Sequence, residues 1–328
     1  MRNRRLCAVV LAVALSVSLS GCMQGRDPSV NWRLSDSMAN LPKLPQRLQI
    51  GRDGVPTLSV YDVSHKKTTK MDIESYVMGV VAGEMKNDWP MEALKAQAIL
   101  ARTFVLKFCQ DKLSKYYGAD ISTDVSEAQA YAPGSVNQRV AQAVKETRGK
   151  VMAWNGEFPN AWFHAHSGGM TELPSVALEY KGGDPAYLKP AVSEESERAP
   201  ESAKRWRAEF TAEQVSRACA DAGVKVPGEI RSVELGEKGE SGRAKTLIVN
   251  GEAVSAPSFR IQIGANELRS TLIDRVKVED GRVVFEGRGF GHGVGLSQWG
   301  AYGMAEDGRS APEIIQKYFP GVKIVELW

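Results

Sequence analysis

Cysteine is scarce in this sequence, which has only four among its 328 residues. Cys7 and Cys22 lie close to the N-terminus, so Cys109 and Cys219 are the two that remain for the body of the chain. One pair of cysteines in a chain of this length is no disulfide framework. The pair can form a single bridge, and two buried free thiols are the other interpretation.

Histidine is as rare as cysteine, with four residues. His164 and His166 are two positions apart, so on a strand both side chains would face one side. A His-x-His pair can bind zinc, but a zinc site needs a third and usually a fourth ligand, and no cysteine lies near this pair. We therefore expect no metal and no other cofactor, with a zinc ion on His164 and His166 as the alternative.

A large excess of either charge is also missing. The sequence has 42 basic and 39 acidic residues, a net charge of +3. Arg2, Arg4 and Arg5 lie in an N-terminal segment whose removal is predicted below, and 42 less these three equals the 39 acidic residues. Bulk charge therefore indicates no polyanionic partner, and we expect no binding to nucleic acid.

Two common enzyme motifs are absent as well. No Gly-x-Ser-x-Gly elbow occurs, and no aspartate stands beside His164 or His166, which disfavours a serine hydrolase. The glycines of residues 287–303 lack a Gly-Lys-Ser/Thr ending, and bare glycine spacing is weak evidence for a phosphate loop.

The N-terminus has the order of a secretory signal: arginines, an apolar run, then small residues up to Cys22. Residues 19–22, Leu-Ser-Gly-Cys, resemble the bacterial lipoprotein box, whose cysteine becomes the lipidated first residue. The apolar run is too short to span a bilayer comfortably, so a lipid anchor is favoured over an uncleaved membrane helix. We expect a signal peptide over 1–21, then a lipidated Cys22 and flexible tether over 22–48, in a protein anchored outside the cytoplasmic membrane of a bacterial envelope.

Helix signals are concentrated between residues 72 and 112. Asp72 suits the N-cap of a first helix, and Pro90 suits the first turn of a second. The second helix has apolar residues at spacings of three and four, which form one stripe. Lys95 and Arg102 are seven positions apart on another face, about two turns from end to end.

Strand signals dominate after residue 149. Asn155-Gly156 stands between two alternating runs and predicts a type I′ hairpin. Helices are expected to return only in "SQWGAYGMAEDG", residues 297–308, and after Ser310, which has capping-box spacing to Glu313. Further strands are expected at 232–236, 245–250 and 282–287.

These patterns predict one α+β domain over residues 49–328. A helical segment would pack with a mixed or antiparallel, β-rich lobe, and the substrate groove would lie between them. The polar run at 193–205 is interpreted as an exposed connection that would separate two lobes.

A single carboxylate, Glu84, stands in "VAGEM", which we interpret as a small-residue turn between the two helices. Its aromatic neighbours in sequence, Tyr76, Trp89 and Phe104, can exclude water from it. Loss of water raises the pKa of a carboxyl group until it can serve as a general acid. A surface glutamate, or a partner for Lys95, is the other interpretation.

Two later segments combine polar side chains with glycine. "FHAHSGGMTE" contains Ser167, Gly168 and Gly169, which allow a ligand to approach the backbone closely. "GRGFGHGVGLSQWGAYG" offers groups of the kind that bind hydroxyl-rich ligands such as sugars. A glycine-rich structural turn is the other interpretation of this last segment.

Together the segments resemble one family. "YVMGVVAGEMKNDWPMEALKAQAILARTF", "AWFHAHSGGMTE", "SGRAKTLIVNG", "ELRSTL" and "GRGFGHGVGLSQWGAYGMAEDG" are similar, in this order, to the stage II sporulation protein D family, also called the SpoIID/LytB domain. The resemblance covers most of residues 50–328.

The resemblance implies a peptidoglycan lytic transglycosylase. Such enzymes cleave between N-acetylmuramic acid and N-acetylglucosamine, leave a 1,6-anhydro end, and in sporulation act on strands stripped of stem peptides by an amidase. Glu84 matches the catalytic glutamate of the family. The implied substrate groove contains Lys95, Arg102, His164, Ser167, Gly168, Gly169, Thr171, Glu172, His292, Ser297 and Gln298.

Lone Glu84 fits this chemistry. A glycoside hydrolase needs two carboxylates, whereas in a lytic transglycosylase the sugar's own 6-hydroxyl attacks, so one group can donate a proton and later accept one. Lys95 or Arg102 would hold the substrate or tune Glu84, although a nearby cation would lower the pKa of Glu84 and oppose its role as an acid.

Three alternatives concern the role of the protein. Relatives described as amidase enhancers suggest a glycan-binding module that stimulates a partner amidase without cutting glycan. A zinc-dependent hydrolase would use His164, His166 and His292, but the cysteines that bind zinc in some family members are missing. The family's sporulation protein has a transmembrane anchor, whereas this chain looks lipidated, so general wall remodelling is expected rather than sporulation.

Overall fold

The computed structural model describes residues 41–328. The predicted signal peptide, the predicted lipidation at Cys22 and most of the predicted tether lie outside the described residues. Among residues 41–328, no helix has the length and apolar character needed to cross a membrane.

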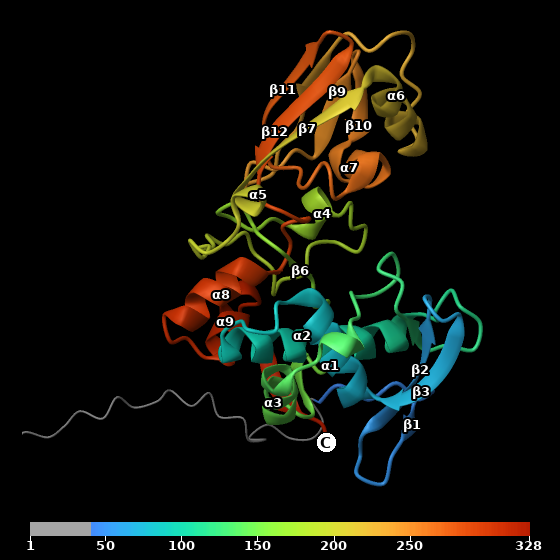
Figure 1. Ribbon diagram of the computed structural model, residues 1–328, viewed down its shortest axis with the longest axis vertical. Coiled ribbons are helices and arrows are strands. Elements are labelled where there is room, and N and C mark those ends of the chain that lie inside the picture. The colour runs from blue at the N-terminus through green and yellow to red at the C-terminus, as the bar shows by residue number, and fades with distance from the viewer. Residues whose placement is uncertain (1–40) are drawn as a thin grey trace, which may run out of the picture. The chain divides into compact units, whose positions relative to one another are not determined.

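The α+β class is confirmed, because the chain combines helices with several mostly antiparallel sheets (Figure 1). The helices are α1 (Ile73–Glu84), α2 (Met91–Asp111), the 3-10 turn η2 (Pro133–Ser135), α3 (Gln138–Glu146), α4 (Pro174–Ala177), α5 (Glu201–Lys204), α6 (Ala212–Asp221), α7 (Ala256–Gly264), α8 (Gln298–Glu306) and α9 (Ala311–Tyr318).

Fourteen short strands form five sheets among the described residues. The first sheet has the order β1-β2-β3, with β4 parallel to β2, and the next two have the orders β10-β9-β8 and β11-β12-β7. The remaining pairs are β13 with β6, which is parallel, and β14 with β5. The strands are β1 (Gln49–Ile50), β2 (Pro56–Asp62), β3 (Lys67–Asp72), β4 (Ile121–Ser122), β5 (Lys150–Ala153), β6 (Phe163–His164), β7 (Arg205–Thr211), β8 (Val233–Leu235), β9 (Thr246–Val249), β10 (Glu252–Ser255), β11 (Ile273–Glu279), β12 (Arg282–Arg288), β13 (Leu296–Ser297) and β14 (Lys323–Glu326).

Both early helices form where the sequence predicts them. Asp72 caps α1 and its side chain accepts a hydrogen bond from the backbone N–H of Ser75. Pro90 immediately precedes α2. The predicted apolar stripe of α2, which includes Leu94, Ala98 and Val105, is buried against α1. The opposite side of α2 packs against α8 and α9 (Figure 1).

The expectation that helices return only near the C-terminus is wrong, because α6 and α7 form within the strand-rich region. Helix α6 begins with a capping box in which Thr211 and Gln214 bond reciprocally. Helix α7 has Ser255 as N-cap and Pro257 in its first turn. These start signals are present in the sequence, and the two helices pack against each other in one core.

The predicted hairpin at Asn155-Gly156 is half confirmed. Both residues have positive φ, 50° and 82°, as a type I′ turn requires. Trp154 and Glu157, on either side of the turn, form a single isolated β-bridge rather than a longer antiparallel ladder. The second run pairs elsewhere, because β6 lies parallel to β13 instead of returning along β5.

The buried side chains form three clusters, and the cysteines lie in different ones. Cys109 belongs to the cluster between α1 and α2, and Cys219 to the cluster beneath α6 and α7. Both thiols are free and buried. Burial raises the pKa of each thiol to about 11, so neither is a reactive thiolate at neutral pH.

Candidate functional site

Glu84 is the last residue of α1 and does not lie in the predicted turn. Its Oε1 accepts a hydrogen bond of 2.7 Å from the backbone N–H of Ala130. Burial raises the pKa of Glu84 to about 7, and hydrogen bonds from Ala130 and from the Gln298 side chain oppose this shift. A carboxyl group with this pKa exists in both protonation states at neutral pH.

Two glycines on one face of α1 bring Ala130 to Glu84. A Cβ at Gly83 would lie 2.7 Å from the carbonyl carbon and oxygen of Ala130, and a Cβ at Gly79 would overlap the ring of Tyr131. The backbone N–H of Ala132 donates to the Gly79 carbonyl at 2.9 Å. Close approach to glycine is therefore what places a backbone donor on the carboxylate. The sequence reasoning missed this segment.

Helix α8 brings the C-terminal motif to the same point. Ser297 is the N-cap of α8 and accepts a hydrogen bond from the backbone N–H of Gly300. The side-chain amide of Gln298 donates to the backbone carbonyl of Glu84 at 3.2 Å. Trp299 packs against Trp89, with ring centroids 4.5 Å apart. The structure thus joins the segment around Glu84, the first motif, to the glycine-rich segment of residues 287–303, the third motif. The second motif is "FHAHSGGMTE", residues 163–172.

The second motif interlocks with the glycine-rich segment. Strands β6 and β13 pair in parallel, and His166 forms a bridge with Phe290. A Cβ at Gly291 would lie 2.7 Å from the Cβ of His164, and a Cβ at Gly295 would overlap the carbonyl of Trp162. These glycines make room for the protein's own backbone, which supports the structural interpretation of the glycine-rich turn.

Glu195 is a site carboxylate that the sequence reasoning missed. Its Oε1 accepts hydrogen bonds from the backbone N–H of Ser167, at 3.0 Å, and from the Ser167 hydroxyl. The Ser297 hydroxyl lies 2.9 and 2.8 Å from its two oxygens. Nε2 of His166 is 3.9 Å from Oε2. Glu195 therefore fixes the start of α8 against the second motif.

Residues 193–205, interpreted as an exposed connection, are exposed at seven of their 13 positions, but the segment also has a buried side. Ser193, Ser196, Ala199 and Ala203 are buried, and the Glu195 side chain is 9% exposed. The buried side of the segment packs against the second and third motifs. There the Glu195 carboxylate, which is largely removed from water, is stabilised by hydrogen bonds from Ser167 and Ser297. No short local pattern in the sequence indicates such a distant pairing.

Arg243 is a second residue that the sequence reasoning did not single out. Its guanidinium is fully buried and donates to the carbonyls of Ser167, at 2.7 Å, and Met170, at 3.0 Å. Gly293 leaves the space for it, since a Cβ there would overlap the guanidinium. Burial lowers the pKa of Arg243 to about 10, so the group stays charged at neutral pH.

Thr171 and Glu172, predicted to line the substrate groove, make internal contacts. The Thr171 hydroxyl accepts from the backbone N–H of Ala191 at 2.9 Å. Glu172 is buried and accepts from the backbone N–H and the hydroxyl of Ser241, at 3.0 and 2.7 Å. We propose that both residues hold the loop walls of the site rather than bind substrate.

The site histidines are held as neutral groups. Nδ1 of His164 donates to the Val294 carbonyl at 3.1 Å, and Nδ1 of His292 accepts from the Val294 N–H at 3.0 Å. Burial lowers the pKa of His164 well below its ordinary value and that of His292 to about 3. Within residues 41–328, no group of three or more His, Cys, Asp or Glu side chains is arranged to hold a metal ion.

Lys95 and Arg102, predicted to hold substrate or tune Glu84, bind other carboxylates. Lys95 forms ion pairs with Glu92, at 2.7 Å, and Glu146, at 2.6 Å. Arg102 is fully buried and makes a two-pronged contact with Glu74, at 3.0 and 2.6 Å. The same carboxylate accepts from the indole of the C-terminal tryptophan. We propose structural roles for both cations.

Comparison with known proteins identifies the family. Residues 61–154 match the family model for the stage II sporulation protein, and residues 180–295 match a domain of unknown function. An uncharacterized protein of Brachyspira hyodysenteriae is 32% identical over 78% of this chain and 67% of its own length.

Two further relatives carry names. Stage II sporulation protein D of Bacillus amyloliquefaciens is 30% identical over 82% of this chain and 79% of its own length. An amidase enhancer of Bacillus subtilis is 28% identical over 75% of this chain and 40% of its own length. Given the match to the family model and the extent of these similarities, the chain belongs to the stage II sporulation protein D family.

Proposed function

We propose that this protein is a peptidoglycan lytic transglycosylase with Glu84 as general acid and base. The observation that carries the proposal is the environment of Glu84, a carboxyl group with a pKa of about 7 beside a fixed backbone donor. A group with a pKa near the working pH can both donate and accept a proton efficiently. The enzyme would cleave the glycosidic bond between N-acetylmuramic acid and N-acetylglucosamine, preferably in strands stripped of stem peptides.

The reaction needs one proton from the enzyme and returns one. Protonated Glu84 donates to the glycosidic oxygen, and the bond from C1 of the muramic acid to that oxygen breaks. The 6-hydroxyl of the same sugar bonds to C1, and its proton passes to the Glu84 carboxylate. The products are a 1,6-anhydromuramyl end and a free 4-hydroxyl, with Glu84 again protonated.

Glu195 does not act as a second catalytic carboxylate in this proposal. Its oxygens already accept hydrogen bonds from Ser167 and Ser297, and water activation requires a carboxylate free to take a proton. We assign it to positioning, because Ser297 begins α8 and the next residue, Gln298, contacts Glu84.

We also propose where the protein acts. The predicted signal sequence and the lipoprotein box at Cys22 favour a lipid-anchored protein on the outer side of the cytoplasmic membrane, where peptidoglycan lies. An amidase that removes stem peptides would supply the stripped strands.

The amidase enhancer among the relatives favours a second candidate function. In that case the protein would bind glycan and stimulate a cell-wall amidase without cutting the glycan itself. The Glu84 carboxyl is partly buried, has a raised pKa and forms no ion pair within residues 41–328, which is better explained by catalysis.

The test uses purified wild-type protein and Glu84→Gln with stripped glycan strands and with intact peptidoglycan, followed by mass spectrometry. Anhydromuramyl products from the wild type alone are expected. Reducing ends would show hydrolysis and refute the transglycosylase. Binding without cleavage, together with stimulation of an added amidase, would favour the enhancer.

A further inference from the structure

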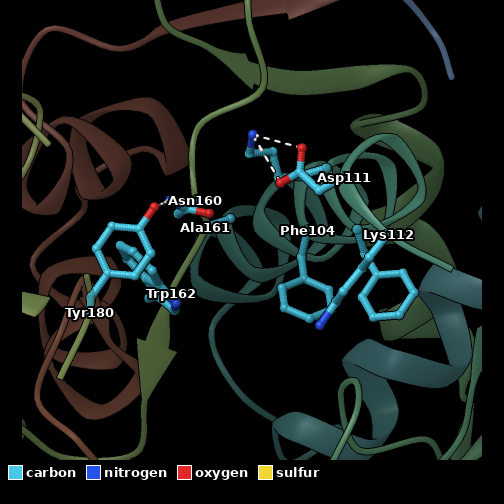
Figure 2. Close-up of a pocket in the computed structure, with 9 residues that line it drawn as sticks. Phe104, Asp111, Lys112, Asn160, Ala161, Trp162 and Tyr180 are labelled. Atoms are coloured by element: carbon cyan, nitrogen blue, oxygen red, sulfur yellow. Dashed lines mark hydrogen bonds and ion pairs between the residues drawn. The ribbon is translucent and has the colours of Figure 1, made fainter. Parts of the chain in front are cut away.

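A pocket of about 290 Å³ lies at the C-terminal third of α2. Phe104 is 13 residues after Met91, the first residue of α2, which at 1.5 Å per residue is about 20 Å along the helix. Neither Glu84 nor its hydrogen-bond partners Ala130 and Gln298 line the pocket, so it is distinct from the site around Glu84. Its lining residues are Phe104, Lys107, Phe108, Asp111, Lys112, Asn160, Ala161, Trp162 and Tyr180 (Figure 2).

Aromatic rings form two walls of this pocket. Figure 2 shows Phe104 of α2 on one side and Trp162 and Tyr180 on the other, with Asn160 and Ala161 between them. The rings of Trp162 and Tyr180 meet edge to face, 5.1 Å apart at 76°. Such rings offer rigid apolar faces at low entropic cost, and concave apolar sites with a few polar groups bind small molecules.

The polar groups of the pocket are concentrated at its rim. Lys107 and Asp111 form an ion pair of 3.1 Å and keep 26% and 47% of their side chains exposed. The ammonium of Lys112 lies 4.5 Å from the centre of the Phe108 ring, and the Asn160 amide donates to the Tyr180 hydroxyl at 3.4 Å. The rim therefore supplies two cations, one anion and an amide, which can bind hydroxyl and carboxylate groups.

These features select a ligand class. A sugar ring has an apolar face of C–H groups and an edge of hydroxyls, which match a flat aromatic wall and a polar rim. The excess of one positive charge favours an acidic sugar. N-acetylmuramic acid exposes a carboxylate once its stem peptide has been removed, whereas N-acetylglucosamine has none.

We propose that this pocket is a second saccharide site that binds an N-acetylmuramic acid ring of a peptide-stripped glycan strand. The proposal rests on the proposed function for the identity of the glycan. A strand held about 20 Å from the start of α2 would raise the effective concentration of its other sugars near Glu84.

The test measures binding at the pocket itself in the non-cleaving Glu84→Gln protein. The protein is labelled with 5-fluorotryptophan, and the Trp162 signal is assigned by its loss in Trp162→Phe. Titration with a stripped tetrasaccharide is expected to shift the Trp162 signal in a saturable way. Tyr180→Ala and Lys112→Ala are expected to weaken this binding at least tenfold, whereas Tyr117→Ala and Lys225→Ala, at exposed positions elsewhere, are expected to leave it unchanged.

Several outcomes separate the pocket from the proposed function. Equal affinities for the two pocket variants and the two controls would overturn the pocket, and Lys112→Ala decides the question if Tyr180→Ala folds poorly. Exclusive binding of peptide-bearing fragments would also overturn it. Pocket binding without anhydromuramyl products from the wild type would instead refute the catalytic proposal and leave the pocket in place.

Discussion

At the scale of single residues, two partly buried carboxylates of α1, Glu74 and Glu84, show how environment decides role. Glu74 is neutralised by the two-pronged contact with Arg102 and serves structure. Glu84 has no ion pair within residues 41–328, and the cause of its raised pKa is burial. The same type of side chain, glutamate, therefore stabilises the fold at one end of α1 and can transfer protons at the other end.

The pH dependence of glycan cleavage follows from the raised pKa of Glu84. Proton donation requires the protonated form, so we expect the cleavage rate to fall about tenfold per pH unit above about pH 7. Initial rates of anhydromuramyl formation between pH 5 and 9 measure this limb. A limb near pH 4.5, the ordinary value for glutamate, would contradict the assignment.

The stability of the protein should depend on Glu84 in the same pH range. The folded pKa of about 7 lies above the ordinary value of 4.5, so the native state binds the extra proton, and stability falls as pH rises from about 4.5 to 7. Glu84→Gln removes this cost. In urea denaturation, we expect the free energy of unfolding of Glu84→Gln to exceed that of the wild type by about 2–3 kcal/mol at pH 8. At pH 4 the two free energies of unfolding should be equal.

The control for this stability experiment is Glu252→Gln, at an exposed position in β10. It should change the free energy of unfolding by less than about 0.5 kcal/mol at either pH. A destabilised Glu84→Gln protein at pH 8 would refute the raised pKa.

At the scale of elements, the function of Glu84 depends on what packs against the end of α1. The glycine pair of α1 admits the backbone of Ala130, and α8 presents Gln298. Neither element is near α1 in the sequence. The protonation of Glu84 thus depends on two contacts with distant parts of the chain, one with Ala130 and one with Gln298.

Gly83→Ala tests the first contact. Alanine is favoured over glycine within a helix by about 1 kcal/mol, but here the added Cβ would lie 2.7 Å from the Ala130 backbone. We expect a net destabilisation of about 1–3 kcal/mol and a loss of cleavage activity. Gly134→Ala, whose Cβ would meet nothing within 4 Å, is the matched control. Unchanged stability and activity in both variants would show that Ala130 is not held through Gly83.

Gln298→Leu tests the second contact through a pH profile. The Gln298 side chain lowers the pKa of Glu84, so its removal should raise that pKa further. We expect the alkaline limb of cleavage to move to higher pH, a shift that mere loosening of α8 would not produce. A limb that stays in place or moves to lower pH would exclude Gln298 from control of Glu84.

At the scale of the whole molecule, buried polar groups tie distant segments to one another. Glu195 joins the second and third motifs, and Arg243 joins the second motif to the loop before β9. Arg102 and Glu74 join α2, α1 and the C-terminal Trp328. Each contact spans residues that are dozens of positions apart, so the site is assembled only in the complete fold.

Arg243→Met tests this long-range assembly. The variant keeps much of the side-chain volume but leaves the carbonyls of Ser167 and Met170 without their donor, which should cost about 2–4 kcal/mol of unfolding free energy. Arg231→Met, at an exposed position, should cost less than about 0.5 kcal/mol. Equal urea midpoints for the two variants would refute the role of Arg243.

The sequence determined the features that depend on near neighbours. The N-cap at Asp72, the stripe of α2, the turn at Asn155-Gly156 and the capping box at Ser310 all form as predicted, because each requires only residues within a turn or two. The motifs around Glu84 and Gln298 also indicate the family from the sequence alone.

Tertiary structure alone decided which of these residues meet. The pairing of Glu195 with Ser167 and Ser297, the donor from Ala130 to Glu84 and the use of Arg102 by Glu74 are contacts across long stretches of chain. No local pattern encodes them, because a polar side chain in the sequence suits water, a ligand or a buried partner equally well. Only burial, which removes the water, forces the choice of partner and sets the pKa of Glu84.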